Sequence, residues 1–101
     1  MRDAADRIEE YVRGMDLHTF EGDTRTQDAV LLQFVIMGEA VRSVDPDILA
    51  RHPYPWNLVR AFRNFIAHQY HAIRMERVYN AANDLAELKK VLARIVDTEF
   101  I

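Results

Sequence analysis

A helical repeat of apolar residues in the middle of the chain most constrains its fold. From about Thr26, apolar residues recur every three or four positions along one stripe: Val30, Phe34, Met37, Val41 and Val44. This spacing is the period of an α-helix, so it predicts the main core helix. Leu31, Leu32, Val35 and Ile36 widen the apolar surface beyond one face, which indicates that neighbours surround the helix or that it lies near a subunit interface.

Gly38 and Glu39 interrupt this stripe. A glycine inside a helix costs about 1 kcal/mol relative to alanine, so we expect Gly38 to allow close approach of another helix. Glu39 in apolar company needs a partner, and Arg63 would suit. The alternative is that Glu39 faces water.

The chain before this helix predicts one further short helix. Residues 3–13 place Ile8 and other apolar residues on one side, and Gly14 is expected to end the helix. Residues 14–24 contain two glycines and several small polar residues, which predicts a loop that Phe20 attaches to the core.

The chain after the core helix predicts three more helices. Asp45-Pro46 is typical of a helix start and predicts a brief helix to about Arg51, after which Pro53 and Pro55 prevent its continuation. Residues 56–68 and 74–97 then show helical spacing again. No stretch has a strand pattern, so we expect an all-α fold, an up-and-down bundle of four main helices plus a short helix.

Length and composition restrict the class of protein. At 101 residues the chain is expected to be a single domain, residues 1–101. It has no cysteine, which excludes disulfides and thiolate metal sites and favours a cytoplasmic location. The alternating charges at the amino terminus do not resemble a signal peptide, and no apolar run is long enough to span a membrane.

Charge is unevenly distributed along the chain. The formal net charge is -3, but residues 51–78 contain five arginines and one acid and carry +4, whereas the rest carries -7. A basic segment in an acidic chain favours a local anion-binding site over general nucleic-acid binding. The alternative is that these arginines only balance acidic helices of the same domain.

The basic segment contains the one group of residues that suggests chemistry, residues 63–70. Arg63 has a planar fork of donors that fits phosphate oxygens, and His68 can exchange protons near neutral pH. Together they suggest phosphodiester chemistry. Five positions place them roughly 140° apart on a regular helix, so they converge only if the helix frays near His68 or a second helix completes the site.

The pattern Arg63, four residues, His68, one residue, Tyr70 resembles the motif of the HepT-like branch of the HEPN superfamily. Three upstream segments resemble family segments in the same order, and the match covers about residues 8–92: Thr26-Gln27-Asp28-Ala29-Val30, Met37-Gly38-Glu39-Ala40 and Pro53-Tyr54-Pro55-Trp56. Four positions after the motif histidine depart from the usual pattern: Gln69, His71, Ala72 and Arg74.

The resemblance implies a HEPN-like bundle and a metal-independent endoribonuclease toxin without cofactor, the partner of a nucleotidyltransferase antitoxin. In such an enzyme the 2'-hydroxyl of RNA attacks the adjacent phosphorus. His68 would transfer the proton, Arg63 would hold the phosphate, and Asn64 or Tyr70 would orient these groups. The family's composite site lies in a homodimer cleft, which supplies a second histidine. The basic segment adds three candidate RNA-binding residues: Arg60, Arg74 and Arg77.

The resemblance also makes Tyr70 a candidate site of modification by the nucleotidyltransferase. A nucleotide attached there would place phosphate beside Arg63 and block the RNA cleft. The alternative is that Tyr70 only packs or orients His68.

The sequence is also compatible with other functions. The chain could be a non-catalytic HEPN subunit that partners a nucleotidyltransferase, or a structural bundle in which Arg63 pairs with Glu39 and His68 satisfies helix-end carbonyls. His68 and His71 have a spacing that could bind a metal, but without cysteine and with Glu76 as the nearest following acid this pattern is weak.

Overall fold

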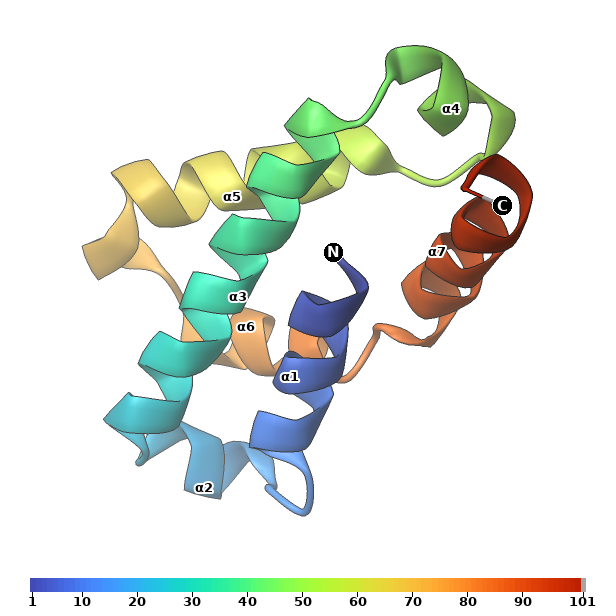
Figure 1. Cartoon of the computed structure of the whole chain (residues 1–101). Helices are drawn as coiled ribbons and strands as arrows, with labels where there is room; N and C mark the ends of the chain where they lie inside the picture. Colours follow the sequence, from blue (N-terminus) through green and yellow to red (C-terminus); the bar gives the residue numbers. More distant parts are fainter. Residues whose placement is uncertain (101) are drawn as a thin grey trace.

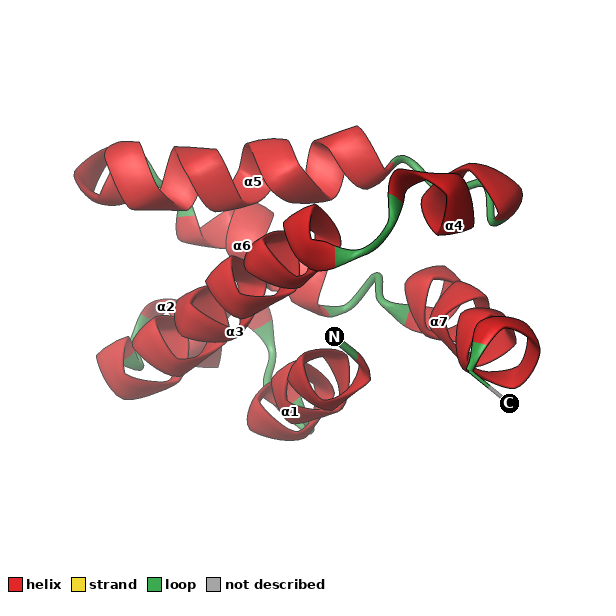
Figure 2. Ribbon diagram, turned by 45° about the horizontal axis from the view of Figure 1, so that its top comes forward, coloured by secondary structure: helices red, strands yellow, loops and turns green. Residues whose placement is uncertain are grey.

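The computed structural model describes residues 1–100, and in this range every regular element is a helix (Figures 1 and 2). The longest helix is α3 (Thr24–Ser43), where the apolar stripe predicted it. α5 (Trp56–His68) packs along one side of α3, and α1 (Arg2–Val12) packs on another, so that α3 lies between them (Figure 2). The prediction of an all-α bundle is confirmed.

The segment after α1 differs in part from its prediction as a loop. Gly14 has φ 76, a conformation suited to glycine just after a helix end. A short helix, α2 (Leu17–Glu21), then forms, because the Asp16 side chain accepts a hydrogen bond from the Thr19 backbone N–H at 2.8 Å. Phe20 on α2 is fully buried, so its predicted attachment to the core is confirmed.

The brief helix after α3 follows its prediction. In α4 (Pro46–Arg51) the Asp45 side chain accepts a hydrogen bond from the Asp47 N–H at 2.8 Å, and proline occupies the first helical position. α5 then begins at Trp56 and ends at His68, the bounds expected from the sequence.

The prediction of a single final helix over residues 74–97 is wrong. A 3₁₀ turn, η1 (Tyr70–Ala72), leads to α6 (Met75–Ala82), and after a break the chain continues as α7 (Ala86–Glu99). At the break the Asn83 side chain donates to the Tyr79 carbonyl at 2.9 Å. Asparagine and aspartate side chains compete for backbone groups in this way, which ends helices that apolar spacing alone would continue.

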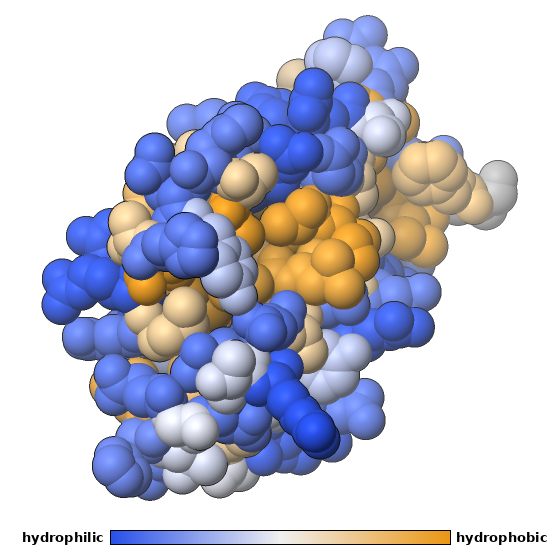
Figure 3. Space-filling model, turned by 90° about the vertical axis from the view of Figure 1, so that its left-hand side faces the viewer, coloured by the Kyte–Doolittle hydropathy of each residue, from blue (hydrophilic) through white to orange (hydrophobic). Residues whose placement is uncertain are grey.

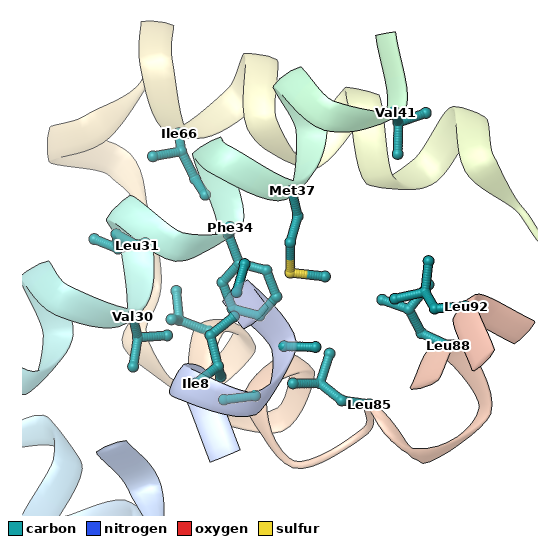
Figure 4. Close-up of a cluster of buried hydrophobic side chains, with 14 of the residues drawn as sticks. Ile8, Val30, Leu31, Phe34, Met37, Val41, Ile66, Leu85, Leu88 and Leu92 are labelled. Atoms are coloured by element: carbon teal, nitrogen blue, oxygen red, sulfur yellow. The ribbon is translucent and has the colours of Figure 1, made fainter. Parts of the chain in front are cut away.

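Four of the five stripe residues of α3 are buried, as the helical period predicts, and Figure 4 shows how they meet side chains from α1, α5 and α7. Val44 is only half-buried because α3 ends at Ser43. The apolar residues beside the stripe differ in burial: Leu31 is buried, whereas Leu32 and Ile36 are exposed. α3 is therefore covered on most sides but not on the strip that carries these two residues.

None of the described helices combines the length and the apolarity that a membrane span requires.

Candidate functional site

The site begins where α3 and α5 cross at Gly38. A side chain at this position would overlap the Arg63 Cβ and lie 2.7 Å from its Cγ. The two helices can therefore approach this closely only because residue 38 is glycine, as the sequence predicted. The close approach fixes the stem of Arg63 against α3.

Two contacts define the position of the Arg63 guanidinium. Its Nη2 forms an ion pair with Glu39 of α3, the partner that the sequence suggested, and its Nη1 donates to Asn64 Oδ1 at 3.2 Å. Its Nε is buried and has no hydrogen-bond partner among the described residues. The Arg63 side chain remains 23% exposed, so part of the fork faces solvent.

Arg63 and His68 line one shallow, open pocket of about 640 Å³. α5 is helical through His68, so the two residues line one pocket without fraying of their helix, and α3 contributes Arg42 to the lining. The pocket is lined by Arg42, Asn57, Arg60, Ala61, Arg63, Asn64 and His68. It thus brings together four of the residues predicted from sequence, together with two polar residues and one alanine that were not predicted.

Arg42 and Asn57 are the two polar lining residues that sequence reasoning missed. Asn57 shares a helical face with Ala61, Asn64 and His68, because these positions step by four, three and four. That spacing could have identified Asn57. Arg42 follows Glu39 by three positions and lies 3.8 Å from its carboxylate. This spacing points to the site only once Glu39 is known to pair with Arg63.

Tyr70 lies apart from this pocket. Its hydroxyl donates to Asp28 Oδ1 of α3 at 2.5 Å, and this hydrogen bond raises the pKa of Tyr70 above its usual value. Tyr70 instead lines a second, mainly apolar pocket, with Asp28, Leu31, Leu32, Val35, Ile66 and Ala67. Asp28 lies in one of the segments that resemble the family, but nothing in the sequence indicated its hydrogen bond to Tyr70, 42 residues away.

The side of the molecule that includes this region has an apolar patch surrounded by polar residues (Figure 3). One exposed apolar residue of α3, Leu32, lines the pocket of Tyr70, and a second, Ile36, follows Leu32 one turn later on the same helix. Tyr70 therefore has an apolar neighbourhood, in contrast to the polar surroundings of His68.

The other two predicted RNA-binding arginines also lie outside the pocket of Arg63. Arg74 precedes α6 and lies 3.7 Å from Glu76. Arg77 lines an apolar groove beside Tyr54 and Leu58. Among the described residues, no group of three histidine, aspartate or glutamate side chains is arranged as metal ligands would be.

Comparison with known proteins supports the resemblance seen in the motif. A family model described as ribonuclease HepT-like matches residues 1–95. A probable ribonuclease HepT of Thermococcus cleftensis is 29% identical over 89 residues, which cover 86% of this chain and 81% of the relative. A protein of Methanocaldococcus jannaschii named as a candidate RNase is 27% identical over 94 residues, which cover 87% of this chain and 78% of the relative. No solved structure matches at a comparable level of significance. Because the family model spans nearly the whole chain, this protein belongs to the ribonuclease HepT-like family.

Proposed function

We propose that this chain is a metal-independent endoribonuclease toxin of a HEPN/nucleotidyltransferase toxin-antitoxin pair. Membership of a ribonuclease family supports RNA as the substrate. The observation that carries the proposal is the pocket in which Arg63, Asn64 and His68 lie together with two further arginines.

The reaction follows from the chemistry of these groups. The 2'-hydroxyl of RNA attacks the adjacent phosphorus, and the bond to the 5'-oxygen breaks. His68 removes the proton from the 2'-hydroxyl or protonates the leaving oxygen. Arg63 stabilises the charge that develops on the phosphate oxygens, while Glu39 and Asn64 hold its guanidinium in position.

The proposed site is composite, because one histidine cannot easily make both proton transfers. A homodimer with the segment 56–70 near its two-fold axis would supply the second histidine. The exposed faces of Leu58 and Phe65, on the same helix as the pocket, support such an interface. Phe65→Ser should shift the protein toward monomer in sedimentation, whereas Phe100→Ser, which changes an equally apolar and more exposed residue, should not. A stable wild-type monomer at micromolar concentration contradicts the dimer.

The catalytic roles are tested by single substitutions. His68→Ala and Arg63→Ala should each abolish cleavage of RNA while the circular dichroism spectrum stays unchanged. His71→Ala is the matched control, since His71 is a nearby exposed histidine outside the pocket. Full activity of either variant in a clean preparation would show that the residue has no catalytic role.

The antitoxin is proposed to act on Tyr70. Its hydroxyl oxygen would attack the α-phosphorus of a nucleoside triphosphate, with pyrophosphate leaving and the proton passing to a base. Tyr70 is 47% exposed as a residue, which supports access by a partner enzyme. Mass spectrometry after co-expression with the neighbouring nucleotidyltransferase should find the added nucleotide on the Tyr70 peptide. Silencing of the toxin without that mass increase would mean that the antitoxin works by binding alone.

One observation favours a second candidate, a non-catalytic subunit that partners the nucleotidyltransferase. Glu39 already neutralises Arg63, which reduces the attraction of that arginine for phosphate. Expression of the chain alone distinguishes the candidates: toxicity that disappears in His68→Ala favours the ribonuclease, and harmless expression favours the subunit.

A further inference from the structure

The pocket of Arg63 and His68 extends well beyond these two residues. Asn57 and Arg60 line it toward the start of α5, and Asn57 precedes His68 by eleven positions. On an α-helix this separation corresponds to about 16 Å along the axis. The pocket is therefore longer than the single phosphodiester on which Arg63 and His68 would act.

The extended part of the pocket has cations with free binding capacity. Arg42 has a side chain 59% exposed, and its ion-pair partner, Glu39, binds Arg63 more closely. Within the described chain, Arg60 has no carboxylate at ion-pair distance. Two such cations next to Arg63 exceed what one phosphate requires, and an exposed arginine binds phosphate well because its fork matches the oxygens.

Asn57 adds a side chain that can form hydrogen bonds with the edge of a base. Its side chain makes no hydrogen bond to any described residue, so both the amide donors and the carbonyl acceptor are free. Single-stranded RNA is recognised largely through hydrogen bonds to the exposed edges of unstacked bases. Ala61, one turn later on the same face, is small and leaves the space above the helix open.

We propose that Arg42, Arg60 and Asn57 form a nucleotide subsite next to the cleavage position, in which the two arginines bind the neighbouring phosphate and Asn57 contacts its base. The subsite rests on the proposed function, since it assigns the substrate of that same pocket to single-stranded RNA longer than a dinucleotide. Arg42 and Asn57 thereby become determinants of affinity and sequence preference, separate from the groups that carry out the reaction.

The test measures binding of fluorescent hexaribonucleotides by anisotropy, in a His68→Ala background so that the RNA stays intact. Arg42→Gln should weaken binding about tenfold, the usual effect of losing one charged contact. It should also reduce the slope of log affinity against log salt by about 0.7, the value for one phosphate contact to a single strand. Arg25→Gln removes an exposed arginine from the same helix outside the pocket and should change neither quantity.

A second measurement tests the base contact. Asn57→Ala should bring the ratio of affinities for oligo(A) and oligo(U) closer to one, whereas Asn80→Ala, an exposed asparagine of α6, should leave the ratio as it is. Equal salt slopes for Arg42→Gln and Arg25→Gln, or an unchanged ratio in Asn57→Ala, would overturn the subsite. Cleavage by the unaltered protein is measured in parallel, so that absent cleavage counts against the ribonuclease and not against the binding result.

Discussion

Replacement of Gly38 by alanine tests the contact on which the site is built. The new Cβ would overlap the Arg63 Cβ, lie 2.7 Å from its Cγ and lie 3.4 Å from the Val59 carbonyl oxygen. The obstructing atoms belong to the stem of Arg63 and to the backbone, so they cannot move aside as the end of a flexible side chain could. α3 and α5 must therefore separate at this point.

Two opposing effects set the size of the expected change. Overpacking of a tight contact costs about 1–3 kcal/mol, and the severe overlap at Gly38 places this substitution at the upper end. Alanine recovers about 1 kcal/mol of helix propensity relative to glycine. We expect a net loss of about 2 kcal/mol in the free energy of unfolding, which for a domain of this size lowers Tm by roughly 10 °C.

Thermal unfolding followed by circular dichroism provides the assay, with Gly22→Ala as the matched control. A Cβ at Gly22 would meet only backbone oxygens at 3.7 and 3.8 Å, an ordinary contact distance, so this variant should keep the wild-type Tm. Because separation of the helices also displaces Arg63, Gly38→Ala should lose RNA cleavage even at temperatures where it is folded. A Tm within 2 °C of wild type, about what a change of roughly 0.5 kcal/mol would cause, would refute the steric reasoning.

Two further predictions concern titratable groups. A hydrogen bond from Arg51, and to a smaller extent one from His52, lowers the pKa of Glu99 to about 2. The ionised Glu99 carboxylate should therefore stabilise the fold above pH 4.5, and this stabilisation should be lost as the pH falls toward 2. The Tm difference between wild type and Glu99→Gln should accordingly vanish across that range, and a constant difference would contradict the assignment. Asp28→Asn should lower the pKa of Tyr70 toward its usual value, because the carboxylate that stabilises the protonated hydroxyl is gone, and an unchanged ultraviolet titration of Tyr70 would show that the hydrogen bond is absent in solution.

Local sequence patterns predicted most of the helices because their causes are local. The apolar period located α3, Asp45-Pro46 located the start of α4, and the prolines before α5 together with the helical spacing of residues 56–68 located its bounds. The break between α6 and α7 was missed because apolar spacing continues across it, whereas a side-chain hydrogen bond from Asn83 ends α6.

The residues of the candidate site could be predicted to a similar degree. The sequence suggested Arg63, Asn64 and His68 as candidates because all three belong to one helix and one motif, where side-chain chemistry and spacing can be read directly. Arg42 was missed because it enters the pocket from α3, and no local pattern reports which residue of another helix faces it.

By itself, the sequence determined the helical fold class, the closeness of approach at Gly38 and the residue types available for phosphodiester chemistry. These properties follow from period, side-chain volume and functional groups, which belong to each residue and its neighbours along the chain. Only the tertiary structure decided that Tyr70 bonds to Asp28 in a pocket apart from His68, and that Arg42 joins Arg60 and Arg63 in one groove. The crossing of α3 and α5 fixes those distances, and a crossing depends on how two distant surfaces pack together.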